Sequence, residues 1–302
     1  MHVWLNGEFV DHEEAMVSVF DAGFQHAVGL FETMRAANGR IFRGADHLDR
    51  LAASAGELQL TERLRTEALI EAVELAVRRN ELSDARVRLT VTGGNLAALA
   101  EAGPGGGPQN PTILIVVQPP TKYPPKFFEE GVTVAIADGR LNPLDMAAGH
   151  KTLNYWPRIH ALQQTARSGA GEAIWFTVTN HLACGSVSNA FLVKDGTLIT
   201  PVAHREEETG ALAAPVLPGI TRATIIECAE TLGLPVERRQ LDIEELLAAD
   251  EVFLTNSSWG VLPVVRVEQE TIGAGTVGAT TRRLRTTYED LVDAETAAPD
   301  HS

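Results

Sequence analysis

His150-Lys151-Thr152-Leu153-Asn154-Tyr155 is the stretch on which the interpretation of this chain depends, because its lysine stands apart from the rest of the sequence. Of the 25 basic residues only four are lysines, at positions 122, 126, 151 and 194, so arginine supplies most of the positive charge. A lysine beside a tyrosine therefore points to chemistry that needs an amine. An amine forms a Schiff base with an aldehyde, whereas a guanidinium does not. On Lys151 alone, a solvated loop lysine is the simpler explanation.

The totals are those of a folded protein that acts on small molecules. A chain of 302 residues with 44% hydrophobic content can build two ordinary domains or one large one. The net charge of −15, with no local Lys/Arg cluster, argues against nucleic acid and anionic membranes as partners. The sequence has neither a signal-peptide pattern nor a segment apolar enough for a membrane helix, so we expect a cytoplasmic protein. Cys184 and Cys228 lack CxxC or histidine spacing, and we expect neither a disulfide framework nor a metal site.

The first part of the chain is predicted to be an α+β unit. Asn6-Gly7 and Asn38-Gly39 each stand between apolar segments, and Asn-Gly accepts the positive φ of a tight hairpin turn. Apolar spacing predicts a helix over 45–58 and a second one, capped by Thr61, that extends to about residue 76. The Gly/Pro-rich insertion 93–111 is expected to be a mobile loop. Strands are predicted over 3–5, 8–10, 31–35, 40–42, 87–92 and 113–117.

A proline-rich segment, 119–125, is the best candidate for a linker, since proline cannot join a central ladder. We place an N-terminal α+β domain at 1–120, a linker at 121–130, a C-terminal α/β domain at 131–292 and a disordered tail at 293–302. Residues 203–214 are expected to form an exposed loop. In the second domain we predict strands over 132–137, 173–178, 252–254 and 261–267, a hairpin at 195–196, and helices over 157–167, 221–232 and 280–292.

Several segments carry side chains that suit an anionic ligand. Leu217–Arg222 places a glycine turn at the start of a helix, where unpaired N–H groups and the helix dipole attract anions, although a cap by Thr221 is the simpler explanation. Arg50 flanks the apolar face of its helix and its fork suits phosphate, although pairing with Asp46 is more common. Two strands end in small polar residues, at 185–191 and at 255–258, and either group forms a ligand site or a simple turn.

Five segments, in order, resemble the fold type IV family of pyridoxal-phosphate enzymes, also called class IV aminotransferases. This family includes branched-chain aminotransferases, D-amino-acid aminotransferases and aminodeoxychorismate lyases. The resemblance covers residues 1–293 and implies a two-domain fold like that of D-amino-acid aminotransferase. It also implies pyridoxal 5′-phosphate in the cleft between the domains, and a homodimer whose sites are completed by the partner. The segments are GLFETMRAANGRIF, HLDRL, HKTLNY, GSVSNAFLVKDG with LPGITR, and FLTNSSWGVLPV.

The resemblance also implies the roles of individual residues. Lys151 would be the Schiff-base lysine and proton carrier, and Tyr155 would lie near the phenolic oxygen of the cofactor. Arg88, by analogy with branched-chain enzymes, would meet a substrate carboxylate, with a salt bridge at the rim as the alternative. Ser258 is a second candidate for contact with substrate. The remaining candidate cofactor-binding residues are Arg50, Cys184, Ser188, Asn189, Ile220, Thr221 and Ser257.

Two departures from the family pattern bear on the reaction. Cys184 stands where the family usually has a glutamate that pairs with the protonated pyridine nitrogen. A thiol holds that proton less firmly, so the ring is expected to be a weaker electron acceptor, which slows transamination more than elimination. Cys184→Glu is therefore expected to raise transamination. The segment 91–94 lacks the Thr-Arg-Gly of the D-amino-acid enzymes, so specificity for D-amino acids is not supported.

The resemblance leaves three functions open. We favour an aminotransferase that acts on small or branched L-amino acids with 2-oxoglutarate or pyruvate. The first alternative is an aminodeoxychorismate lyase that releases pyruvate and 4-aminobenzoate, which Cys184 strengthens. The second is a protein that binds pyridoxal phosphate without turnover.

Overall fold

The computed structural model describes residues 1–61, 64–95 and 110–297, and the chain divides into two units. The first unit comprises Met1–Thr121, His150–Asn154 and Val292–Ser302, and the second comprises Lys122–Gly149 and Tyr155–Leu291. From sequence, residues 150–154 were predicted to lie in the C-terminal domain. They group with the first unit because their backbone is hydrogen-bonded to its sheet, a long-range pairing that local sequence does not reveal.

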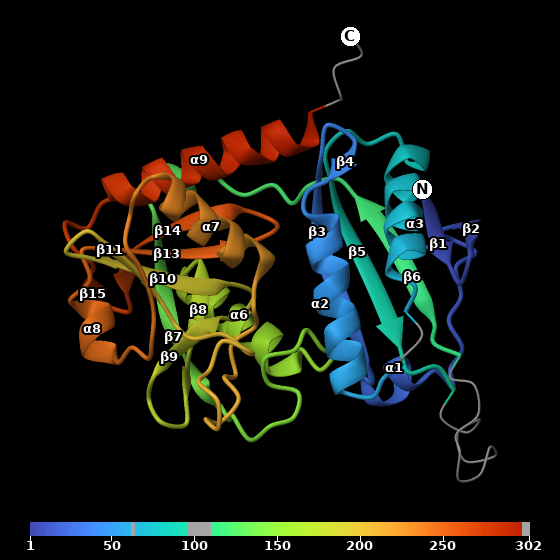
Figure 1. Ribbon diagram of the computed structural model, residues 1–302, viewed down its shortest axis with the longest axis horizontal. Helices are drawn as coiled ribbons and strands as arrows, with labels where there is room; N and C mark the ends of the chain where they lie inside the picture. Colours follow the sequence, from blue (N-terminus) through green and yellow to red (C-terminus); the bar gives the residue numbers. More distant parts are fainter. Residues whose placement is uncertain (62–63, 96–109, 298–302) are drawn as a thin grey trace. The chain divides into compact units, whose positions relative to one another are not determined.

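The first unit is built on a six-stranded sheet with the strand order β2-β1-β6-β5-β3-β4 (Figure 1). Its hairpins turn at Asn6-Gly7 and Asn38-Gly39, and all four residues have positive φ, as the sequence predicts. The short α1, Ala22–His26, is capped by the carboxylate of Asp21. The strands are β1 (His2–Leu5), β2 (Glu8–Asp11), β3 (Gly29–Ala37), β4 (Arg40–Ile41), β5 (Ala85–Thr92) and β6 (Ile113–Gln118).

Two helices, α2 (Gly44–Glu57) and α3 (Thr66–Arg79), pack against this sheet and close its core (Figure 1). Leu48, Leu51 and Ala55 of α2 are buried, as their spacing predicts, and each fully buried aliphatic side chain contributes about 1.5–3 kcal/mol. The predicted cap of the second helix is wrong. α3 begins at Thr66, because Thr61 is buried beside the end of α2 and lies too far upstream to cap it.

The second unit contains a nine-stranded sheet that closes on itself. β9 pairs with β8 on one side and with β10 on the other, so β10, β13, β14, β7, β8 and β9 form a closed ring of strands. The closing pair joins Cys184 and Asn189. The strands are β7 (Val132–Leu141), β8 (Glu172–Thr177), β9 (Leu182–Gly185), β10 (Asn189–Lys194), β11 (Thr197–Thr200), β12 (Val236–Arg238), β13 (Glu251–Asn256), β14 (Gly260–Val267) and β15 (Glu270–Thr271).

The three longer helices of this part agree with the predicted positions except at the end of the chain. Two short helices were not predicted, at Lys126–Glu129, inside the predicted linker 121–130, and at Ile243–Leu247. α9 continues to Thr296, whose side chain is buried, so residues 293–296 are helical and the predicted disordered tail is wrong for them. Thr296 donates to Val292 O, one turn earlier in the helix, and accepts from Asn38 Nδ2, a contact too distant in sequence to predict. The predicted loop residues 96–109 and the last five residues lie outside the described residues. The helices are α5 (Lys126–Glu129), α6 (Trp156–Ser168), α7 (Ile220–Thr231), α8 (Ile243–Leu247) and α9 (Ala279–Thr296).

Residues 201–219 form no regular element, as expected for the predicted loop, but Ala203 and His204 at its start are buried. A search of the described residues for a helix of membrane-spanning length and hydropathy finds none.

Candidate active site

The backbone of Lys151 is held against β3. Phe31 N donates to Lys151 O at 2.9 Å, Leu153 N donates to Gly29 O at 2.9 Å, and Leu30 bridges Thr152. This pairing requires Gly29, because a Cβ there would lie 2.6 Å from Val91 O and 2.7 Å from Leu153 Cδ1. The lysine backbone is therefore fixed by β3 and is not part of a free loop.

The amine of Lys151 lies against the aromatic ring of Phe31, with its Nζ 4.4 Å from the ring centroid. The guanidinium carbon of Arg88 lies 3.9 Å from the same centroid. Strand alternation explains the arrangement: on β5 the side chains of Val87 and Leu89 enter the core, which turns Arg88 to the other face of the sheet. Lys151 and Arg88, both predicted site residues, thus lie against the same ring. Phe31 itself was not predicted as a site residue.

Arg50 of α2 reaches the core face of β3, where it binds Glu32. Its Nε and NH2 donate to the two carboxylate oxygens at 2.8 and 2.6 Å, and His47 Nδ1 lies 2.8 Å from Oε2. Burial alone raises the pKa of Glu32, but the charges and hydrogen bonds of Arg50 and His47 outweigh it and hold this pKa at about 2. Burial lowers the pKa of His47, and the charge of the nearby Lys151 contributes.

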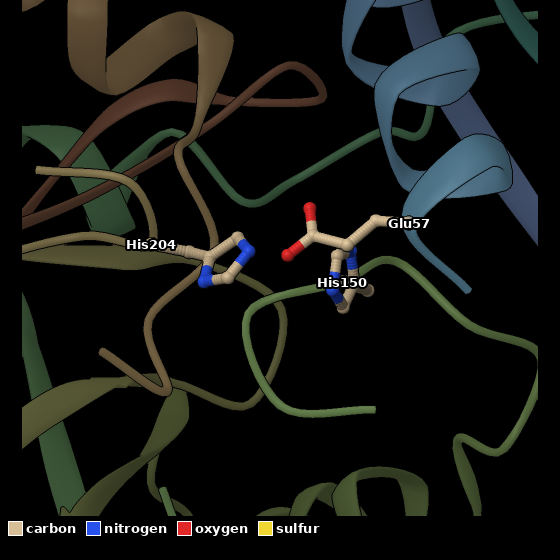
Figure 2. A group of neighbouring side chains, drawn as sticks. All are labelled: Glu57, His150 and His204. Carbon is tan, nitrogen blue, oxygen red and sulfur yellow. The ribbon is translucent and has the colours of Figure 1, made fainter. Parts of the chain in front are cut away.

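Glu57, at the end of α2, and His150 lie side by side (Figure 2). His150 Nδ1 is also 3.0 Å from Ser54 Oγ. A carboxylate and an imidazole are ordinary metal ligands, but two ligands from one unit do not complete a site. His204, the third side chain in Figure 2, belongs to the second unit.

In the second unit, the start of α7 is an uncapped helix end. Gly219 is its N-cap residue and supplies no side chain, so the prediction that Thr221 caps the helix is wrong: Thr221 is the second helical residue, and it is buried. A Cβ on Gly219 would overlap Asn189 Oδ1, and Asn189 Nδ2 donates to Leu217 O at 2.8 Å. The first N–H groups of α7, including those of Ile220 and Thr221, therefore suit an anion.

The end of β13 adds hydroxyl groups to the same unit. Thr255 pairs with Asn189 across the sheet, and its buried Oγ1 has no hydrogen-bond partner among the described residues. Asn256 Oδ1 accepts from the backbone N–H groups of Ser258 and Trp259 at 2.8 and 3.0 Å, which fixes the turn that carries Ser257 and Ser258. A buried hydroxyl with no partner is costly, and a ligand oxygen would satisfy it.

Cys184 is buried on β9 in an apolar cluster that includes Trp175 of β8. Glu172, at the start of β8, is buried among polar groups. The Glu172 carboxylate accepts from the N–H groups of Ala173 at 2.9 Å and Ser186 at 3.2 Å, and from Ser188 Oγ at 3.4 Å. Burial raises the pKa of Glu172 to about 7, and these hydrogen bonds offset the rise only in part.

Arg158, from the first turns of α6, lies against Cys184. Its NH1 donates to Gly185 O at 3.0 Å and to Ser186 O at 3.2 Å, and lies 3.5 Å from Cys184 Sγ. Its Cζ is 5.8 Å from the ring of Tyr155, the residue that precedes α6, and 5.7 Å from the ring of Trp175 on β8. Tyr155 and Cys184, both predicted site residues, therefore flank the same guanidinium.

Comparison with known proteins identifies the family. The model of the amino-transferase class IV family matches residues 29–267. The chain belongs to this family.

A curated relative, a putative branched-chain-amino-acid aminotransferase of Methanocaldococcus jannaschii, is 33% identical over 292 residues, which cover 96% of each chain. A solved branched-chain aminotransferase from the thermophilic archaeon Thermoproteus uzoniensis, with norvaline, has a TM-score of 0.85 at 29% identity and covers 98% of this chain and 95% of that chain. A 4-amino-4-deoxychorismate lyase from Pseudomonas aeruginosa has a TM-score of 0.79 at 29% identity, with 95% of this chain and 98% of that chain covered.

These matches to class IV aminotransferases confirm the predicted family, fold class and enzyme class. The individual roles assigned to its residues remain predictions. Lys151, Arg50 and Arg88 belong to the first unit, and the other predicted residues belong to the second.

Four residues that were not predicted from sequence lie beside predicted site residues of this class IV protein, two in each unit. Phe31 and Glu32 stand inside the quoted GLFETMR segment, and an acidic residue within an apolar strand was a usable signal for Glu32. Glu172, the first residue of the apolar strand β8, gave a similar signal. Arg158 gave no signal, because an arginine in an amphipathic helix is ordinary.

Proposed function

We propose that this class IV aminotransferase moves an amino group between a small or branched L-amino acid and a 2-oxo acid, using pyridoxal 5′-phosphate bound to Lys151 as a Schiff base. The observation that carries this proposal is the shared position of Lys151 and Arg88 on the Phe31 ring. An amino acid carries its amine and its carboxylate on one carbon. An enzyme for it needs an amine-exchanging group close to a carboxylate receptor, and a guanidinium suits that receptor.

The chemistry of the donor groups fits the cofactor. Its phosphate would be held by the uncapped N–H groups of Ile220 and Thr221, by the hydroxyl of Ser257, and by the orphaned hydroxyl of Thr255. Its aldehyde would be held by the amine of Lys151. When bound, pyridoxal phosphate would accept the electron pair released at the substrate α-carbon.

Lys151 would also take the α-proton and return it. Because β3 fixes the backbone of Lys151, its amine would stay within reach of the substrate α-carbon. Arg88 would orient the substrate through its carboxylate. We retain Arg50 as a further phosphate contact, positioned by Glu32, and Tyr155, Ser188, Asn189 and Ser258 as additional contacts to cofactor or substrate.

Cys184 favours a second candidate, an aminodeoxychorismate lyase. A thiol at the ring-nitrogen position would weaken the electron acceptor, and elimination of pyruvate tolerates this better than transamination does. The likeness to the Pseudomonas aeruginosa lyase supports this alternative, but it is no greater than the likeness to branched-chain aminotransferases.

We further propose that the protein is a cytoplasmic homodimer. Its cysteines are both free and buried, which suits a reducing compartment. Five large apolar side chains within residues 16–24 are exposed, a density that favours burial against a second copy. They are Met16, Val17, Val19, Phe20 and Phe24.

An absorbance spectrum of the cofactor-loaded protein tests the proposal. If an L-amino acid replaces the band of the lysine-bound cofactor with that of its amine form, the protein is an aminotransferase and the responding amino acids define its substrate class. If amino acids leave the band unchanged and aminodeoxychorismate yields pyruvate, the lyase is correct. A lysine-bound cofactor that responds to neither would identify a binding protein without turnover.

A further inference from the structure

We propose that Arg158 keeps the ring nitrogen of pyridoxal phosphate unprotonated by placing a fixed positive charge beside Cys184. This inference rests on the proposed function, in which Cys184 faces the ring nitrogen. It assigns an electrostatic role to Arg158 and places a positive charge beside Cys184, where the sequence alone indicated only the loss of a carboxylate.

Arg158 is anchored where it can act on whatever faces Cys184. Its NH1 donates to the carbonyl oxygens of Gly185 and Ser186 and contacts Cys184 Sγ, so three successive residues at the end of β9 hold one nitrogen. The guanidinium also lies near the rings of Tyr155 and Trp175. These contacts prevent the side chain from turning away to solvent, and its position is set by the closed ring of strands.

Among the residues that the structure describes, no carboxylate at hydrogen-bond distance cancels the charge of Arg158. Its acceptors are two neutral carbonyl oxygens and a sulfur. The nearby carboxyl is Glu172, whose oxygens are occupied by Ala173 N, Ser186 N and Ser188 Oγ. Burial raises the pKa of Glu172 to about 7, so near neutral pH this carboxyl is ionised only about half of the time. The site around Cys184 is therefore electropositive.

The positive charge of Arg158 disfavours a second positive charge on the ring nitrogen. At a separation of about 5 Å and an effective dielectric constant of about 20, repulsion between two positive charges shifts a protonation equilibrium by roughly a hundredfold. The ring nitrogen would then stay neutral. The carboxylate introduced by Cys184→Glu would pair with Arg158, so this change alone would not restore a protonated ring. It would therefore not raise transamination, contrary to the expectation from the sequence. Removing Arg158 as well would free the carboxylate to hold the proton.

Nuclear magnetic resonance of protein loaded with ring-¹⁵N pyridoxal phosphate tests this at pH 7.5. We expect the ¹⁵N shift of a neutral pyridine in the wild type and in Cys184→Glu, and the shift of a pyridinium in the double variant Cys184→Glu/Arg158→Met. Methionine keeps the unbranched apolar stem of Arg158 and removes its charge. The wild-type spectrum is decisive without any variant, because a pyridinium shift there overturns the inference. A neutral ring in the double variant overturns it as well.

Binding of N-methylated pyridoxal phosphate gives a second readout, because its ring carries a permanent positive charge. Relative to pyridoxal phosphate, we expect its affinity to rise at least tenfold in Arg158→Met. The matched control is Arg140→Met, since Arg140 of β7 also donates to backbone carbonyls, those of Ala137 and Gly139. Equal effects of the two substitutions would contradict the inference. If borohydride traps no cofactor on Lys151, the proposed function fails; if it does and the ring is protonated, only this inference fails.

Discussion

Glu32 and Arg50 form a two-pronged ion pair, with 2.8 Å between Nε and Oε1 and 2.6 Å between NH2 and Oε2. Their side chains are 1% and 10% exposed. Water therefore cannot solvate the remaining charge if its partner is removed. The pair joins the core face of β3 to α2. Because β3 also carries Lys151 through its backbone, this ion pair stabilises the frame on which the lysine is held.

Glu32→Gln should therefore lower the free energy of unfolding by about 3 kcal/mol at pH 7, since it removes the buried carboxylate charge that binds the guanidinium through two hydrogen bonds. The pKa of Glu32 in the folded state, about 2, lies below its ordinary value of 4.5. The pair thus contributes fully above about pH 4.5 and loses its contribution as the pH falls toward 2. Urea unfolding at pH 7 and pH 3 measures both effects.

The control is Glu74→Gln, which breaks an exposed ion pair with Arg78 on α3. Such pairs contribute about 0.5 kcal/mol or less. Equal losses in the two variants would show that the Glu32 pair is no more important than a surface contact.

Lys151→Arg keeps the positive charge and removes the amine. If the lysine is the Schiff-base residue, activity should fall by about 10² to 10⁴, and borohydride should no longer fix the cofactor to the chain. Mass spectrometry of the reduced protein detects that bond directly. Lys194→Arg is the control, because Lys194 is an exposed lysine that pairs with Asp250. Cofactor still trapped on the Lys151 variant would assign the role to another amine.

Glu172→Gln tests the raised pKa of this buried carboxyl. The folded protein holds the Glu172 proton up to about pH 7, whereas a carboxyl with the ordinary value loses it near 4.5. The stability of the wild type should therefore fall as the pH rises from about 4.5 to 7, by up to about 3 kcal/mol from this group. Glutamine resembles the protonated form, accepting from Ala173 N and donating to Ser188.

The variant should lack this fall, and at pH 8 it should be more stable than the wild type. Urea midpoints across pH 4.5–8 provide the comparison. Parallel curves for the two proteins would mean that Glu172 titrates normally.

The sequence predicted elements whose information is local. The period of apolar residues in α2, the Asn-Gly turns and the glycine at the start of α7 each act within a few residues, and the structure contains all three. The start of α3 was misplaced because threonine is a residue type that caps helices, whereas Thr61 is buried upstream of the helix, which begins at Thr66.

The contacts that organise the site are long-range, and periodicity does not encode them. The pairing of Lys151 with β3 joins residues about 120 positions apart in sequence, and the closure of β9 on β10 depends on the curvature of the whole sheet. Only the folded sheet brings Arg158 and Glu172 next to residues 184–188, so their roles could not be inferred from sequence. The family resemblance supplied the candidate site residues, but their hydrogen-bond partners had to come from the structure.

Phe24→Asp tests the proposed homodimer. Phe24 is 75% exposed within the apolar segment 16–24, and a carboxylate there would be buried without a partner in a dimer interface. We expect the variant to elute as a monomer in size-exclusion chromatography with light scattering. Leu75→Asp is the control, since Leu75 is a 46% exposed apolar residue on α3 outside that segment. A monomeric wild type, or a dimeric Phe24 variant, would contradict the proposal.

Thr255→Val should have opposite effects on the empty and the loaded protein. Valine preserves the shape of Thr255 and removes a hydroxyl that is buried without a hydrogen-bond partner among the described residues. The cofactor-free protein should gain about 1 kcal/mol of stability, because an unsatisfied polar group is removed. Affinity for pyridoxal phosphate should fall about tenfold, because the phosphate loses a donor.

Urea unfolding of the cofactor-free protein and titration with pyridoxal phosphate measure the two changes. Thr200→Val is the matched control, since Thr200 Oγ1 donates to Ala190 O at 2.9 Å and accepts from Arg222 Nε at 3.2 Å. Removing this satisfied hydroxyl should destabilise the protein by about 1–2 kcal/mol. Loss of stability in Thr255→Val with unchanged affinity would mean that this hydroxyl supports the fold and not the cofactor. A gain in stability paired with weaker binding would identify Thr255 as a donor kept for a ligand at the expense of the empty protein.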